Sequence, residues 1–244
     1  MSRPAYALYA AIAYAVFFAT FLYLIAFVGN LPLVPRTVDT GPVAPLLPSL
    51  AVDLGLIAVF GIQHSVMARR GFKAWWTRTV PEPIERSTYV LLSSAALILL
   101  FAFWQPLPAT LWRVGGFGAI VLWTLFAAGW LIVLLSTFLI NHFELFGLAQ
   151  VFRHWRGTAA APPRLSQPFF YRLVRHPLYS GFFLAFWATP VMTLGHLVLA
   201  LGMSVYMLIA IPHEERDLVH IFGDDYEDYR RSVGMLVPGV GRRA

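Results

Sequence analysis

The chain has 244 residues, of which 59% are hydrophobic, 12% are charged and none is cysteine. Soluble domains carry about 25% charged residues, so this composition excludes an ordinary soluble enzyme. The absence of cysteine excludes thiolate catalysis, cysteine-ligated zinc, iron–sulfur clusters and disulfide bonds, and we expect no metal site. The net charge of +6 does not indicate nucleic-acid binding, because the basic residues lie at the ends of apolar stretches and form no long run.

Six apolar stretches make up about half of the chain: 5–28, 47–68, 88–104, 114–140, 178–193 and 196–212. A bilayer core about 30 Å thick takes roughly 20 helical residues. The last two stretches are short, and we expect them to form a helical hairpin that turns at residues 193–196. The sequence therefore predicts an all-α, multi-pass transmembrane bundle of five to six spans, organised as one integral-membrane domain over residues 1–244.

The basic residues indicate which way the bundle faces. Of the eighteen lysines and arginines, only Arg36 and Arg113 fall on the predicted outer side. Because cytoplasmic loops carry the excess of these residues, we expect both termini to be cytoplasmic. Beyond Pro212 the sequence becomes amphipathic, and Gly223 is expected to separate two cytoplasmic C-terminal helices.

Ionisable residues gather at the predicted cytoplasmic ends of the spans. Polar groups at membrane depth indicate function. Because most of them lie on the predicted cytoplasmic side, we expect any reaction to use a small molecule from the cytoplasm. The residues concerned are His64, Arg86, His142, Glu144, Arg175, His176, His213, Glu214 and Glu215. Asp53, in the outer half of the second stretch, is expected to be a buried hydrogen-bond partner or a helix cap near Ser49.

The densest polar pattern runs over residues 174–181. Pro177 suits the first position of a helix and biases His176 toward an extended conformation. The first backbone N–H groups of that helix then stay available, and together with Arg175 they suit a carboxylate or a phosphate. Gly181 would let a ligand or another helix approach closely. The alternative is an interfacial helix start whose polar side chains are merely solvated.

A second pattern follows the last apolar stretch. Glu214 and Glu215, preceded by His213, lie just below it. Two adjacent acids can pair with an ammonium group or accept hydrogen bonds from ribose hydroxyls. The alternative is a juxtamembrane helix with a charged face.

Taken in order, these patterns resemble a known family. The series Arg-His-Pro-x-Tyr-x-Gly, an apolar hairpin, Glu-Glu-x-x-Leu and Gly-x-x-Tyr-x-x-Tyr covers about residues 165–238. It is similar to the membrane superfamily of isoprenylcysteine carboxyl methyltransferases and phospholipid N-methyltransferases. The resemblance implies that S-adenosylmethionine binds in a part covering about 142–238. Carried over by position, the cofactor-binding residues are Arg175, His176, Tyr179, Gly181, His213, Glu214 and Glu215.

Three further segments, 63–69, 85–89 and 141–148, extend the resemblance to nearly the whole chain. They look like the nurim-like branch, and most closely like bacterial methanethiol S-methyltransferases, which make dimethyl sulfide. This implies an enzyme of the bacterial cytoplasmic membrane that acts on a small thiol and has no obligate protein partner. A methyltransferase for a lipid or isoprenoid thiol or acid, and a non-enzymatic nurim-like membrane protein, stay open as alternatives.

Methylation of a thiol requires a group that accepts the thiol proton, and two histidines of the sequence are candidates. Thiols are poor nucleophiles until they are deprotonated, and a neutral imidazole can accept the proton. His142 and His64 each lie at the inner end of a span, and we expect one of them to be catalytic. Glu144 and Arg86 are the candidates for the substrate site.

Overall fold

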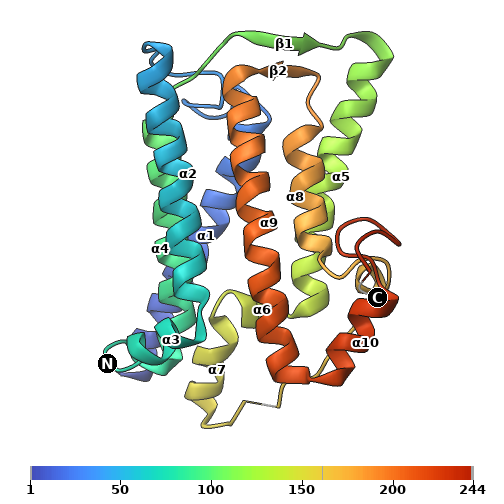
Figure 1. Cartoon of the computed structure of the whole chain (residues 1–244). Helices are drawn as coiled ribbons and strands as arrows, with labels where there is room; N and C mark the ends of the chain where they lie inside the picture. The colour runs from blue at the N-terminus through green and yellow to red at the C-terminus, as the bar shows by residue number, and fades with distance from the viewer. Residues whose placement is uncertain (1, 161, 243–244) are drawn as a thin grey trace. The chain divides into compact units, whose positions relative to one another are not determined.

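A computed structural model describes residues 2–160 and 162–242 of the chain (Figure 1). Arg243, one of the basic residues counted toward the cytoplasmic side, lies outside the described residues. Five helices in the described chain are long and apolar enough to cross a membrane: α1 (Arg3–Val28), α2 (Leu46–Ala68), α4 (Glu82–Phe103), α5 (Gly116–Ile140) and α9 (Leu194–Phe222). They confirm the prediction of a multi-pass helical bundle.

The outer surfaces of these helices are apolar as well. Ile62 on α2 is 64% exposed and Ile120 on α5 is 63% exposed. Such exposure is unfavourable in water but expected where hydrocarbon chains are the solvent. The protein is therefore an integral membrane protein.

Contacts divide the chain into two compact units. The ranges Met1–Trp112, Phe143–Ala160 and Met192–Gly202 form unit 1. The ranges Arg113–His142, Ala161–Val191 and Met203–Ala244 form unit 2. The candidate cofactor-binding residues and His142 belong to unit 2, whereas His64, Arg86 and Glu144 belong to unit 1.

Unit 1 is built around α4. This helix packs against α1 and α2, and the short helices α3 (Arg70–Trp76) and α7 (Leu148–Arg156) pack beside the same spans. Asp53 is fully buried on α2, and its Oδ1 accepts the backbone N–H of Gln105 at 2.8 Å, where the chain leaves α4. The prediction that Asp53 is a buried hydrogen-bond partner is confirmed.

Unit 2 is built on the pairing of α5 with α8 (Pro177–Trp187). A Cβ atom on Gly181 of α8 would lie 2.7 Å from the Gly129 carbonyl oxygen, and one on Gly129 of α5 would lie 2.8 Å from the Gly181 carbonyl oxygen. Each glycine therefore permits the close approach of the two helices. The short 3-10 helix η1 (Phe169–Arg172) precedes α8, and α10 (Asp224–Ser232) follows α9 after Gly223.

The expected hairpin is present, but its two arms are unequal. α8 has 11 residues, whereas α9 has 29 and continues through Pro212. Pro190 disfavours helix at the preceding residue, and the next residues form strand β2 (Val191–Thr193) rather than helix. The turn therefore precedes α9 and does not lie at residues 193–196. β2 pairs with strand β1 (Thr110–Arg113) in a two-stranded sheet.

Candidate functional site

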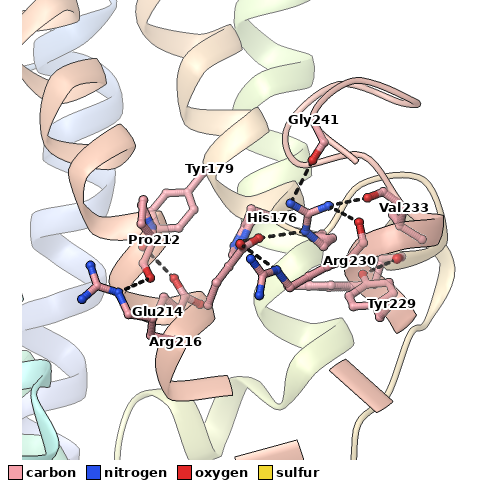
Figure 2. Close-up of polar contacts among 12 residues, drawn as sticks. His176, Tyr179, Pro212, Glu214, Arg216, Tyr229, Arg230, Val233 and Gly241 are labelled. Atoms are coloured by element: carbon pink, nitrogen blue, oxygen red, sulfur yellow. Dashed lines mark hydrogen bonds and ion pairs between the residues drawn. The ribbon is translucent and has the colours of Figure 1, made fainter. Parts of the chain in front are cut away.

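The candidate cofactor residues converge at the base of α8 and on α9 in unit 2 (Figure 2). α8 begins at Pro177, with His176 as its N-cap residue, as the sequence predicts. Within the described residues, no side chain caps this N-terminus. Its second turn carries Gly181, which is buried against α5.

Glu215 is the centre of a buried ionic cluster. Its Oε1 accepts hydrogen bonds from Arg175 Nε at 2.8 Å and from His176 Nε2 at 3.2 Å. Its Oε2 lies 3.3 Å from Nε of Arg230 on α10. All four side chains are less than a tenth exposed, so each charge relies on these partners instead of water.

The remaining donors of Arg175 bind α10 and the C-terminal segment that follows it. Nη1 donates to the carbonyl oxygens of Arg230 and Val233, and Nη2 donates to that of Gly241. The backbone N–H of Arg175 also donates to the Gly234 carbonyl at 2.8 Å. Arg175 thus fixes the C-terminal segment onto the start of α8.

Buried tyrosines pack against the start of this segment, where Tyr226 and Tyr229 form a cluster with Val233. The hydroxyl of Tyr229 donates to the carbonyl oxygen of Tyr171. Burial raises the pKa of Tyr229 to about 12, although the nearby charge of Arg175 opposes the shift. Burial also raises the pKa values of Tyr171 and Tyr226. These phenols therefore stay neutral across the physiological pH range.

Glu214 differs from its neighbour. It is exposed, and its Oε2 accepts a hydrogen bond from the hydroxyl of Tyr179 at 3.0 Å. Arg216 turns back onto α9 and donates from Nε to the Pro212 carbonyl at 3.3 Å, as Figure 2 shows. The exposed acid is therefore the carboxylate of this cluster that a soluble ligand can reach.

His142 lies directly after α5 in the same unit. Its Nδ1 is 2.8 Å from Oγ1 of Thr137, and its ring stacks on Phe138 at 4.1 Å between centroids with a 4° interplanar angle. The ring is 5% exposed. Burial lowers the pKa of His142 and so favours the neutral form of the ring.

In unit 1, His64 lies between α2 and α4. Its Nδ1 is 3.1 Å from Oγ of Ser93, and its Nε2 is 2.8 Å from the hydroxyl of Tyr89. The guanidinium of Arg86 lies over the Tyr89 ring, 4.9 Å from its centroid. His64 is thus held by hydrogen bonds at both ring nitrogens.

The two candidate substrate residues also have internal partners. Arg86 donates from Nε to the Leu145 carbonyl at 2.8 Å. Glu144 accepts two hydrogen bonds from the guanidinium of Arg153, which is the main cause of the lowered pKa of Glu144. This bidentate pair, together with the hydrogen bond from Gln150 to Glu144, joins α7 to the short helix α6 (His142–Leu145) that precedes it.

Two residues of these clusters were missed in the sequence. In the sequence, Arg230 is not distinguished from the other basic residues of an amphipathic tail. Its contact with Glu215 arises only because α10 folds back toward α9. Thr137 reads as part of an apolar span. Thr137 precedes His142 by five residues. This spacing indicates a contact only weakly, because α5 ends between the two residues.

Comparisons with known proteins identify relatives of the chain. The NnrU protein family matches residues 54–236. A methanethiol S-methyltransferase of Mycobacterium tuberculosis is 53% identical and covers 98% of each chain, and one of Crocosphaera subtropica is 49% identical and covers 100% of this chain and 96% of its own. The pig protein nurim is 31% identical over 72% of this chain and 70% of its own. No solved structure matches significantly.

Proposed function

Because the chain belongs to the NnrU protein family and is about half identical to methanethiol S-methyltransferases along nearly its whole length, we propose that it transfers a methyl group to methanethiol and releases dimethyl sulfide. The identity along the full length of both chains is the observation that carries this proposal. A location in the bilayer suits the substrate, since a small neutral thiol partitions into apolar surroundings.

We propose S-adenosylmethionine as the methyl donor and the part over about 142–238 as its binding region. When bound, this cofactor supplies an electrophilic methyl group on a sulfonium. Its other groups are a carboxylate, an ammonium and ribose hydroxyls. The side chains present fit them: Glu214, held by Tyr179, suits the ammonium or the ribose, and the uncapped first turn of α8 suits the carboxylate.

The buried ionic cluster around Glu215 positions the cofactor site in this proposal and does not itself contact the cofactor. Arg175, His176 and Glu215 bond to one another across α8 and α9. They therefore keep Tyr179 and Glu214 within hydrogen-bond distance of each other. We assign them to positioning the cofactor site, with Gly181 setting the distance between α8 and α5. His213, one residue before Glu214, stays a candidate contact.

The thiol must lose its proton as its sulfur attacks. We propose a histidine as the acceptor, with His142 and His64 as the two candidates, because a neutral imidazole of suitable pKa accepts protons efficiently near pH 7. The roles of Glu144 and Arg86 in the substrate site stay predictions, and their observed contacts in unit 1 support a part in shaping the loop.

We also propose that both termini face the cytoplasm. Pairing of β1 with β2 places the α8–α9 turn on the same side as the α4–α5 loop. The 11 residues of α8 span about 16 Å at 1.5 Å each, which is about half of the roughly 30 Å thickness of the core. A hairpin returns the chain to its starting side even where this arm crosses the core only in part. An even number of crossings returns the chain to its starting side, where the basic residues concentrate.

Membranes carrying the protein test the proposed function. Supplied with methanethiol and S-adenosylmethionine, they are expected to release dimethyl sulfide into the headspace, measured by gas chromatography. Membranes without the protein serve as the control. Equal release from both would overturn the proposal, and product from a longer isoprenoid thiol alone would favour the lipid-directed alternative.

A further inference from the structure

The C-terminal segment that Arg175 holds, residues 233–241, is apolar along its whole length. It contains only valine, glycine, methionine, leucine and proline. It follows the strongly charged helix α10, and the next charged residue along the chain is Arg242. Within it, Val237 is 56% exposed and Val240 is 62% exposed. Exposed apolar side chains that lie close together indicate contact with another apolar surface.

The packing of α5 against α8, both in unit 2, gives the depth of this segment along the span. A Cβ atom on Gly181 would lie 2.9 Å from the backbone nitrogen of Val133, and one on Gly129 would lie 2.7 Å from that of Ala185. The two helices therefore run antiparallel, with Gly181 level with Val133. At 1.5 Å per residue, this level is about 10 Å from the end of α5 at Ile140.

Ser180, one residue before Gly181, holds the segment near this level. Its Oγ donates to the carbonyl oxygen of Leu236 at 2.7 Å. The 25 residues of α5 extend about 37 Å, which exceeds the roughly 30 Å of the hydrocarbon core by about 7 Å. Even if all of this excess lies at the end near Ile140, Ser180 and Leu236 are at the depth of the core. Figure 1 shows the segment, in red, next to the base of α8.

The backbone of the segment is suited to surroundings without water, where polar backbone groups must be satisfied within the protein. The N–H of Val240 donates to the Val237 carbonyl at 3.0 Å, and the N–H of Met235 donates to the Val240 carbonyl at 2.8 Å. These two bonds close residues 235–240 into a loop. Donors of Arg175, His176 and Ser180 bind further carbonyls, which are those of Val233, Gly234, Met235, Leu236 and Gly241.

We propose that residues 236–240 insert into the lipid bilayer beside α8, with Val237 and Val240 in contact with the acyl chains. The partner of this surface is the membrane in which the protein already lies, because α5 of the same unit spans it. Interfacial anchors typically bury an apolar face roughly 5–10 Å into the boundary between headgroups and acyl chains. The inserted loop holds the start of α8, and with it Tyr179, at a fixed depth.

The absence of cysteine from the chain makes a direct test possible. Val237→Cys and Val240→Cys each take one nitroxide spin label, and the protein is reconstituted into vesicles of phosphatidylcholine and phosphatidylglycerol. Electron paramagnetic resonance compares collisions of the label with oxygen, which concentrates in lipid, and with a water-soluble nickel chelate on both sides of the bilayer. Leu131→Cys on α5, at a position 54% exposed, is the reference for lipid. Ser232→Cys, at the exposed end of α10, is the reference for water.

We expect the ratio of oxygen to nickel collisions at Val237 and Val240 to exceed that at Ser232 at least about threefold, as for a site several ångströms below the headgroups. A ratio equal to that at Ser232 would overturn the proposal, because the loop then lies in water. Low collision rates with both reagents would also overturn it, because protein then covers the loop. Each position is measured separately, so either variant decides the result if the other does not fold.

Discussion

Nε of Arg175 lies 2.8 Å from Oε1 of Glu215, and both side chains are almost completely buried. Forty residues of sequence separate them, and between them α8 leaves this point and α9 returns to it. Removing one member of a buried ion pair leaves an uncompensated charge, which costs more than the pair itself contributes. This contact therefore determines how the two helices that carry Tyr179 and Glu214 are joined.

The adjacent acids Glu214 and Glu215 are predicted to differ in what they support. Glu215→Gln leaves Arg175 and Arg230 without their carboxylate and should lower the free energy of unfolding by about 3–5 kcal/mol. Glu214→Gln, at an exposed position, should leave the melting temperature unchanged and weaken binding of S-adenosylmethionine. Thermal unfolding in detergent and titration calorimetry separate the two effects. Equal loss of stability in both variants would contradict the assignment.

Arg175→Lys is predicted to release the C-terminal segment. Arginine donates from three nitrogens to Glu215, Val233 and Gly241, whereas lysine has one donor nitrogen and cannot reproduce this fork. Limited proteolysis should then cut after α10 much faster than in the wild type. Arg172→Lys is the control, since Arg172 is exposed and bonds only weakly to the Gln167 carbonyl, at 3.3 Å. Unchanged cleavage in Arg175→Lys would show that the segment is held by other contacts.

Gly181→Ala is predicted to separate α8 from α5. The added Cβ would meet the Gly129 carbonyl oxygen at 2.7 Å and the Val133 backbone nitrogen at 2.9 Å. Such overpacking costs about 1–3 kcal/mol, measured as a lower melting temperature. Gly55→Ala on α2 is the control, because nothing lies within 4 Å of its Cβ and a helical glycine costs roughly 0.5–1 kcal/mol relative to alanine. A melting temperature for Gly181→Ala at or above that of the wild type is the contrary result.

The buried phenol of Tyr229 predicts a loss of stability at alkaline pH. Its pKa is raised to about 12 by burial, against about 10 in an unfolded chain. The folded state therefore binds the proton more tightly, so the stabilising contribution is complete below pH 10 and is lost as the pH rises toward 12. Melting temperatures measured over this interval should fall more steeply in the wild type than in Tyr229→Phe. Parallel curves would exclude this linkage.

Sequence predicts the spans and the end of the molecule that carries the polar residues, because hydropathy and periodicity are local. It also places Pro177 at the start of a helix and Gly223 between two helices. The difference between Glu214 and Glu215 does not follow from the local sequence. Glu215 is buried because α10 and the segment beyond it fold back over α8, and a sequence pattern does not distinguish a carboxylate that binds a ligand from one that binds Arg175.

The length of α9 is a second feature that the local sequence does not predict. An apolar stretch that ends at Pro212 suggests the end of a helix, yet α9 continues for ten more residues to Phe222. The Thr137–His142 contact is likewise not predicted by the local sequence, because it arises where the chain reverses direction at Asn141. Both features depend on tertiary packing, which overrides local preference.

The purified protein, given deuterated methanethiol and unlabelled S-adenosylmethionine, provides a direct test of the proposed methyl transfer. The proposed function predicts that mass spectrometry of the headspace detects dimethyl sulfide with one deuterated and one unlabelled methyl group, and much less of it from Glu214→Gln than from the wild type. The absence of mixed-label product from a folded wild-type protein that binds S-adenosylmethionine would contradict the proposed function.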